Sequence, residues 1–131
     1  MRATITQSVR FRTTTVSRAR QKGTVFETAL VGWFHENGFP GVERMPFSSP
    51  LGDLAGLPVC AEAKNQVAMK LPEWLAQAEK SGQKCGLPFM IFHKRARKPI
   101  GKTYVTTELE QITPLLLELV ALRSASISLK A

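Results

Sequence analysis

Four residues combine charge with a spacing that suits metal chemistry or hydrolysis: Glu27, Asp53, Glu62 and Lys64. Glu62 and Lys64 end the mostly apolar run 57–64, which predicts a half-buried strand. Side chains alternate along a strand, so these two charges share one face while the alanines beside them take the other. Burying charge is costly unless the charges pair or hold a metal. The pattern therefore predicts a charged site at one edge of a core.

Phosphodiester cleavage needs an activated water and neutralised phosphate charge, and a carboxylate-bound divalent metal supplies both. Asp53 and Glu62 are the natural ligands, with the Ala63 carbonyl as a further donor and Glu27 acting through a water. Hard oxygen donors suit Mg²⁺, for which Mn²⁺ is the expected substitute. Lys64 could orient or deprotonate the attacking water. We therefore expect the catalytic group to be Glu27, Asp53, Glu62 and Lys64.

Each of these residues also has a purely structural interpretation. Glu27 completes a capping box with Thr24 at the start of a predicted helix. Asp53 follows a glycine and fits a turn, and Glu62 with Lys64 fits a surface ion pair on an edge strand. Three independent structural causes would have to coincide, whereas one metal site explains all of them.

Length and composition favour one ordinary globular domain. The chain has 131 residues, of which 44% are hydrophobic and 21% charged, enough to form a core without disulfides or structural zinc. No apolar stretch is expected to reach the length of a membrane span. The first residues lack the apolar run of a secretory signal, so we expect a cytoplasmic protein without a membrane partner. Cys60 and Cys85 are interpreted as reduced thiols, and neither His35 nor His93 has zinc-ligand spacing from them.

The net charge of +8 favours a polyanionic partner. Basic residues gather in two clusters that flank the acidic ones, and this arrangement is more typical of nucleic-acid binding than of a merely soluble surface. The candidate DNA contacts are Arg10, Arg12, Arg18, Arg20 and Lys22 before the first acid, and Lys94, Arg95, Arg97 and Lys98 near the end of a predicted strand.

The elements that must position these residues form a mixed α/β sheet with helices on its faces. Residues 1–22 are expected to be a basic arm, disordered alone or paired as a strand in a dimer, ahead of a folded domain at 23–131. The leucines of the last helix are expected to lie mainly in the core, with some apolar surface left for a partner chain, and this helix and the amino-terminal arm are the candidate contacts of a dimer. The predicted order begins with a helix at 24–37 ended by Gly38, a short strand within 39–46, a loop at 48–53 and the strand ending at Lys64. A helix from Pro72 to a stop at Gly82 and an apolar central strand at 88–93 follow. The last elements are a strand within 100–105 and a helix that is opened by a capping box at 107–110 and interrupted near Pro114.

Several short motifs together resemble the PD-(D/E)xK nuclease superfamily, which has the restriction-endonuclease-like fold. Within it, the chain is similar to the Holliday junction resolvases of archaea and some phages. The resemblance spans about residues 22–105 and depends on short motifs at 22–27, Gly38-Phe39, 44–46, Ser48, Asp53 and 62–64.

This resemblance implies that Glu27 is the acid of the first helix, that Asp53 and Glu62 bind Mg²⁺, and that Lys64 is the catalytic lysine. It further implies that Ser48 or Ser49 lies near the scissile phosphate. Two features depart from the pattern: a glycine precedes Asp53 where the superfamily has proline, and an Arg-rich arm precedes Lys22.

The implied activity is a Mg²⁺-dependent endonuclease acting on four-way or branched DNA, working as a homodimer so that two symmetric strands are cut. Two alternatives stay open. One is another nuclease of the superfamily, a nicking, repair or restriction enzyme acting on ordinary duplex. The other is a non-catalytic basic DNA-binding protein whose acids are structural.

Overall fold

A short parallel strand pair lies inside a mixed sheet of five strands in the order β1-β2-β3-β4-β5. The computed structural model describes residues 2–130, with side chains described for residue 18 and for 20–129. β3 and β4 run parallel, with Glu62 opposite Ile91 and Lys64 opposite His93. The other neighbouring strands are antiparallel. The strands are β1 (Glu43–Arg44), β2 (Leu54–Ala55), β3 (Cys60–Lys64), β4 (Phe89–His93) and β5 (Tyr104–Thr106).

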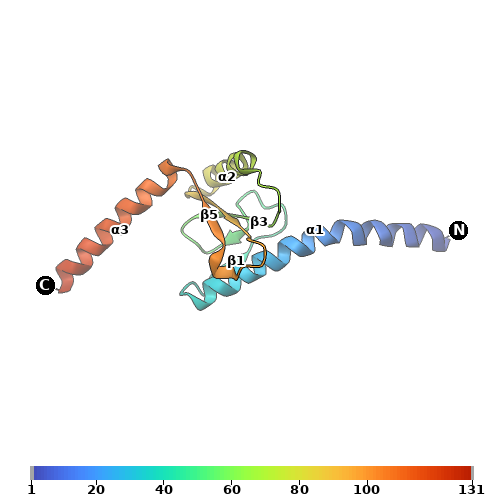
Figure 1. Cartoon of the computed structure of the whole chain (residues 1–131), viewed down its shortest axis with the longest axis horizontal. Helices are drawn as coiled ribbons and strands as arrows, with labels where there is room; N and C mark the ends of the chain where they lie inside the picture. The colour runs from blue at the N-terminus through green and yellow to red at the C-terminus, as the bar shows by residue number, and fades with distance from the viewer. Residues whose placement is uncertain (1, 131) are drawn as a thin grey trace.

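Two helices cover opposite faces of this sheet: α1 (Arg2–Glu36) and α2 (Leu71–Cys85) (Figure 1). Alternation along β3 explains the arrangement, because successive side chains enter different layers. Ala61 packs into a cluster with Phe26 of α1. Its neighbour Cys60 packs into a second cluster with Trp74 of α2. The prediction of a mixed α/β sheet flanked by helices is thus confirmed at the level of architecture.

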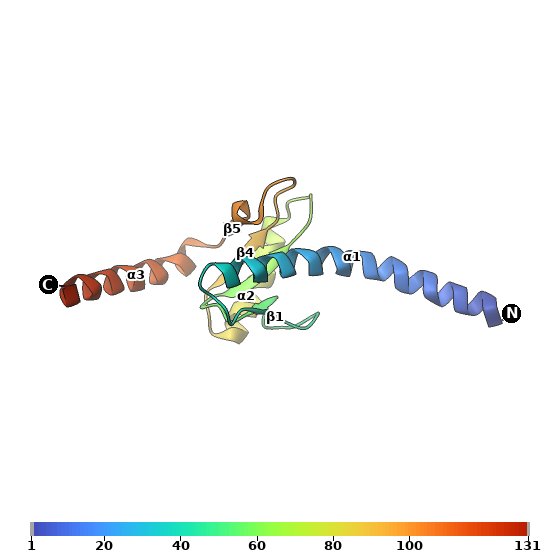
Figure 2. The same ribbon diagram turned by 90° about the horizontal axis from the view of Figure 1, so that it is seen from below.

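The start of the first helix was predicted wrongly, whereas its end was predicted well. α1 begins at Arg2 rather than Thr24, so residues 2–22 continue this helix instead of forming a strand. Figure 2 shows the first half of α1 extending beyond the sheet as one continuous helix. The chain turns just after Glu36, at Gly38, whose φ of 99° few residues other than glycine adopt.

α2 ends one turn later than predicted. Its stop is Gly86, which is left-handed with φ 69° and donates its N–H to the carbonyl of Gly82. Gly82 instead lies buried inside the helix, where a Cβ would come within 3.0 Å of the Leu87 carbonyl oxygen. Close packing against the chain leading into β4, rather than a left-handed turn, explains this glycine.

The last helix, α3 (Leu109–Lys130), differs most from expectation. Pro114 lies within it without ending it. The capping box does not form, because the Thr107 hydroxyl donates to the carbonyl of Phe89. Before it, residues 100–102 form the 3₁₀ helix η1 (Ile100–Lys102), so only 104–106 are strand.

The leucines of α3 do not join the core, and the helix points away from the sheet in both views (Figures 1 and 2). Leu117, Leu122 and Leu129 are among its exposed residues. The segment Leu109–Leu129 has a mean hydropathy of 1.5 and no buried residues, and its length and composition match a membrane span. The expectation that no segment reaches that length is therefore wrong on those two criteria. The sequence pattern of an apolar helix does not tell which surface covers it, because the same pattern occurs in core helices, partner-binding helices and membrane spans.

Candidate metal and nucleic-acid site

Glu62 is a buried acid in the middle of β3. Its side chain is 3% exposed, and Ser81 of α2 donates a hydrogen bond of 2.8 Å to its Oε1. Burial, and after it the neighbouring Asp53 carboxylate, raise the pKa of Glu62 to about 7, although the Ser81 hydrogen bond and Lys64 act in the opposite direction. The structure thus holds a carboxylate where its own charge is unfavourable.

Asp53 is fixed beside Glu62 by the chain entering β2. The Ala63 N–H donates to Asp53 Oδ2 at 2.7 Å, and the Asp53 N–H donates to the Ala61 carbonyl at 2.8 Å. These bonds attach the acid to β3 at two points. Gly52, just before it, has φ +92°. A proline, whose φ is fixed at about −65°, could not adopt this backbone conformation, so a proline is excluded at this position in the observed loop.

Glu27 approaches the same place from α1. It forms an ion pair of 3.9 Å with Arg44 of β1, and Arg44 also donates to the Thr24 hydroxyl at 3.2 Å. Burial and the Asp53 carboxylate raise the pKa of Glu27, and Arg44 lowers it. The capping-box interpretation is wrong, because Thr24 and Glu27 lie well inside a helix that begins at Arg2.

These three acids line one cavity of about 570 Å³. They come from a helix, a loop before a strand and a strand, and the structure therefore brings together residues far apart in the chain. The predicted residues in the lining are Arg20, Glu27, Ser48, Ser49, Asp53, Glu62 and Ala63, and the others are Gly23, Thr24, Arg44, Phe47 and Gln77.

Lys64 lies beside this cavity rather than in its lining. Its Nζ donates a hydrogen bond of 2.6 Å to Oε1 of Gln77 on α2. Its charge also lowers the pKa of Glu62, so the two groups interact electrostatically. The alternation predicted for β3 is confirmed: both Glu62 and Lys64 meet α2, through Ser81 and Gln77.

The donor set fits Mg²⁺ better than a metal that needs many protein ligands. Among the residues whose side chains the structure describes, no three His, Cys, Asp or Glu lie closely enough to form a metal site by themselves. Mg²⁺ commonly keeps several waters and uses only one or two carboxylates. Asp53 and Glu62, with the Ala63 carbonyl as main-chain donor, match that requirement.

The predicted DNA contacts divide into two groups. Arg20 lies at the cavity, where its guanidinium carbon is 4.0 Å from the Phe47 ring centroid. Arg18 and Lys22 are exposed on the same helix. The side chains of Arg10 and Arg12 lie outside the described residues.

The second basic cluster occupies the loop after β4 and is not in the cavity lining. Arg95 packs over the Tyr104 ring at 4.1 Å, and Lys94, Arg97 and Lys98 are exposed. His93, at the end of β4, is 5% exposed and hydrogen-bonded to Thr106. Its position in the interior fits a structural role rather than a phosphate contact.

Two residues at the site, Gln77 and Ser81, were missed in the sequence, and Arg44 was noted only within the 44–46 motif, without a role. The two on α2 leave a readable signal, because they share one helical face with the buried Trp74 and Ala78 at spacings of three and four residues. Polar side chains on the inward face of a helix need a buried partner. No comparable pattern predicts the ion pair of Arg44 with Glu27, because the pairing of β1 brings the two together.

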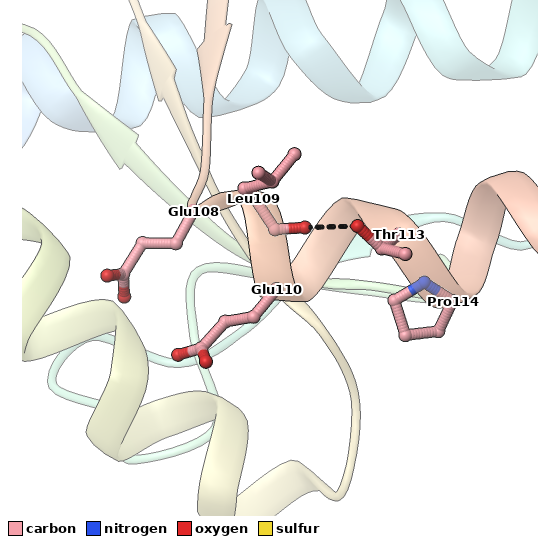
Figure 3. Close-up of a pocket in the computed structure, with 5 residues that line it drawn as sticks. All are labelled: Glu108, Leu109, Glu110, Thr113 and Pro114. Atoms are coloured by element: carbon pink, nitrogen blue, oxygen red, sulfur yellow. Dashed lines mark hydrogen bonds between the residues drawn. The ribbon is translucent and has the colours of Figure 1, made fainter.

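Two other features carry no site. A hollow of about 720 Å³ at the first turn of α3 is lined by Glu108, Leu109, Glu110, Thr113 and Pro114. Figure 3 shows that its residues come from one short stretch, in which the Thr113 hydroxyl donates a hydrogen bond to the Leu109 carbonyl.

The thiols of Cys60 and Cys85 are free, and their sulfur atoms lie 3.4 Å apart. Burial raises the pKa of the Cys60 thiol to about 12, which makes this thiol unreactive.

Comparison with protein-family models, curated proteins and solved structures finds no match to this chain. The interpretation of the site therefore depends on its residues and their geometry.

Proposed function

We propose that this protein is a Mg²⁺-dependent, structure-selective DNA endonuclease that hydrolyses phosphodiester bonds in four-way junctions. The observation that carries the proposal is the convergence of Glu27, Asp53 and Glu62 on one cavity that Arg20 and Arg44 also line. Carboxylates can hold a divalent metal and arginines can bind a phosphate, so a cavity lined by both suits a metal bound beside a phosphate.

The roles of the residues follow from their contacts. A bound divalent cation supplies an activated water and offsets phosphate charge. Asp53 and Glu62 would hold it, the first anchored by the Ala63 N–H and the second by Ser81. Lys64, whose Nζ donates to Gln77, would orient or deprotonate the attacking water and offset charge on the phosphate.

The electrostatics of the acid pair supports the same role. Burial and the mutual repulsion of Glu62 and Asp53 both disfavour the ionised pair, and the pKa of Glu62 is raised to about 7 as a result. A divalent cation reverses both effects, because it favours the ionised form of each carboxylate.

DNA would be held mainly through its phosphates, which suits recognition of a branched shape more than of a base sequence. Deleting residues 1–17 removes the first three arginines while leaving Arg18 and Arg20. If those arginines bind phosphates, the salt dependence of DNA binding flattens by about 0.9 in slope for each lost contact. An unchanged slope would show that this part of α1 does not bind DNA.

The decisive test compares cleavage of a four-way junction with a matched linear duplex, with and without Mg²⁺. We expect Glu62→Gln and Asp53→Asn to abolish cleavage while DNA binding is retained. Glu73→Gln, an exposed acid in the first turn of α2, is the matched control and should cleave normally.

The other outcomes separate the competing functions. Equal cutting of junction and duplex would indicate a general nuclease of the same chemistry. Absence of any metal-dependent cutting by the parent protein, with DNA binding intact, would reject catalysis and leave a DNA-binding protein.

A further inference from the structure

α3 exposes an unusually continuous apolar surface to solvent. Of its residues, Leu109 is 78% exposed, Leu122 68% and Leu129 89%, and no residue in 109–129 is buried. One of its few links to the sheet is at its first turn, where Gln111 accepts a hydrogen bond from the Phe89 N–H. Helices of this length gain most of their stability by packing an apolar face, so α3 needs a partner.

The spacing of its residues identifies the face that would pack. Apolar side chains occur on every side of α3, and one set of them recurs at steps of three and four, which is the a/d pattern of a coiled coil. Pro114 and Leu117 fall at outward positions of this repeat. The six seam positions are Ile112, Leu115, Leu119, Leu122, Ser126 and Leu129, and only one of them is polar.

Charge then selects a partner and an orientation. Glu118 occupies a g position, just before the seam residue Leu119. Arg123 occupies an e position, five residues after Glu118. In a parallel pair in register, each g side chain faces the e side chain of the partner's next heptad. Glu118 would therefore meet the partner's Arg123 on both sides of the seam, whereas an antiparallel pair places g beside g and e beside e.

We infer that α3 forms a parallel two-stranded coiled coil with α3 of a second copy of this chain. Self-pairing satisfies the seam and both charges with the same residues, as two-fold symmetry requires. A lipid bilayer fits less well, because Glu118 lies near the middle of Leu109–Leu129, where an ionised side chain is costly. The inference is independent of the proposed nuclease activity, since neither depends on the residues of the other.

The test is the mass of the full-length chain in detergent-free buffer, measured by size exclusion with light scattering. We expect a dimer at micromolar concentration. Leu119→Glu places charges at the seam and should raise the dimer dissociation constant by about 100-fold or more. The matched control is Leu117→Glu, the same change at an exposed outward position of the same helix, which should leave the dimer intact. Tryptophan fluorescence on urea unfolding verifies that both variants keep a folded body.

Orientation is tested separately. Leu122→Cys should crosslink to the partner's Leu122→Cys under mild oxidation, beyond any background from the native cysteines in the parent protein. Glu118→Arg alone should weaken the dimer, and adding Arg123→Glu should restore it.

Three results would overturn the inference: a monomeric parent protein, equal effects of the changes at Leu117 and Leu119, or a dimer that does not crosslink through Leu122→Cys. Co-sedimentation of the parent protein with neutral phosphatidylcholine vesicles, together with a monomeric state without them, would assign the helix to a membrane instead.

Discussion

The hydrogen bond from Ser81 to Glu62 gives the sharpest test of the site, because Ser81 contacts this acid from behind and does not itself line the cavity. The perturbation is Ser81→Ala. Both side chains are buried, with Ser81 7% and Glu62 3% exposed, so water cannot readily replace the lost donor. Alanine fits the helix and removes a single oxygen, and the effect should therefore be confined to the acid.

The expected magnitude depends on the ionisation of Glu62. Its pKa is raised from an ordinary value of 4.5 to about 7 in the folded protein, so in the absence of metal its contribution to stability is present at low pH and is lost as the pH rises through that window. Removing Ser81 raises the pKa further, because this hydrogen bond lowers it. We expect Ser81→Ala to cost about 1.5–3 kcal/mol at pH 8, where an ionised acceptor loses its donor, and about 0.5–1.5 kcal/mol at pH 5.5.

Metal binding should weaken in parallel. Ser81 orients a proposed ligand, and losing such an outer partner typically reduces metal affinity about 10- to 100-fold. The same change also makes deprotonation of Glu62 harder, and deprotonation must accompany binding.

The assay is urea unfolding at both pH values, with Mg²⁺ titration by calorimetry at pH 8. Ser124→Ala, an exposed serine of α3, serves as the control and should change neither quantity. Equal destabilisation at the two pH values, or an unchanged Mg²⁺ affinity, would show that Ser81 does not control the ionisation of Glu62.

Three further predictions test the parts that surround the acids. Gly52→Ala should destabilise the folded protein by about 2 kcal/mol or more, because Gly52 has a φ of +92° and a Cβ there would lie 2.9 Å from the Ala61 oxygen. Gly38 has a similar φ of +99° but open space around it, so Gly38→Ala should cost only about 1 kcal/mol in the same urea experiment. Burial lowers the pKa of His93 below 6.5, so the contribution of neutral His93 to stability is present above that pH and is lost as the pH falls. His93→Gln should remove this part of the pH dependence. An unchanged slope of the unfolding free energy between pH 7 and 5.5 would contradict the prediction. Gln77→Leu frees Lys64 and should slow cleavage by about tenfold with an unchanged dissociation constant for DNA, as single-turnover kinetics beside a binding titration would show; equal losses in binding and rate would instead assign Gln77 to DNA contact.

Local sequence information determined the parts of the fold that depend on alternation and on single special residues. The 57–64 run predicted β3 and the shared face of Glu62 and Lys64, because side-chain direction in a strand follows directly from parity. Gly38 predicted the turn after α1 for a similar reason, since a positive φ is a property of the residue itself. The grouping of Glu27, Asp53 and Glu62 was predicted by the order and chemistry of the residues, and the structure places all three on one cavity.

What the sequence could not determine depended on which surfaces meet. The true start of α1 and the exposure of α3 were missed, because helical and apolar patterns do not state what an element packs against. The partners of the acids were likewise invisible: Arg44 reaches Glu27 through strand pairing, and Ser81 reaches Glu62 through packing of α2 on the sheet. Pairing and packing join residues far apart in the chain, and only the folded arrangement fixes those distances and the pKa values that follow from them.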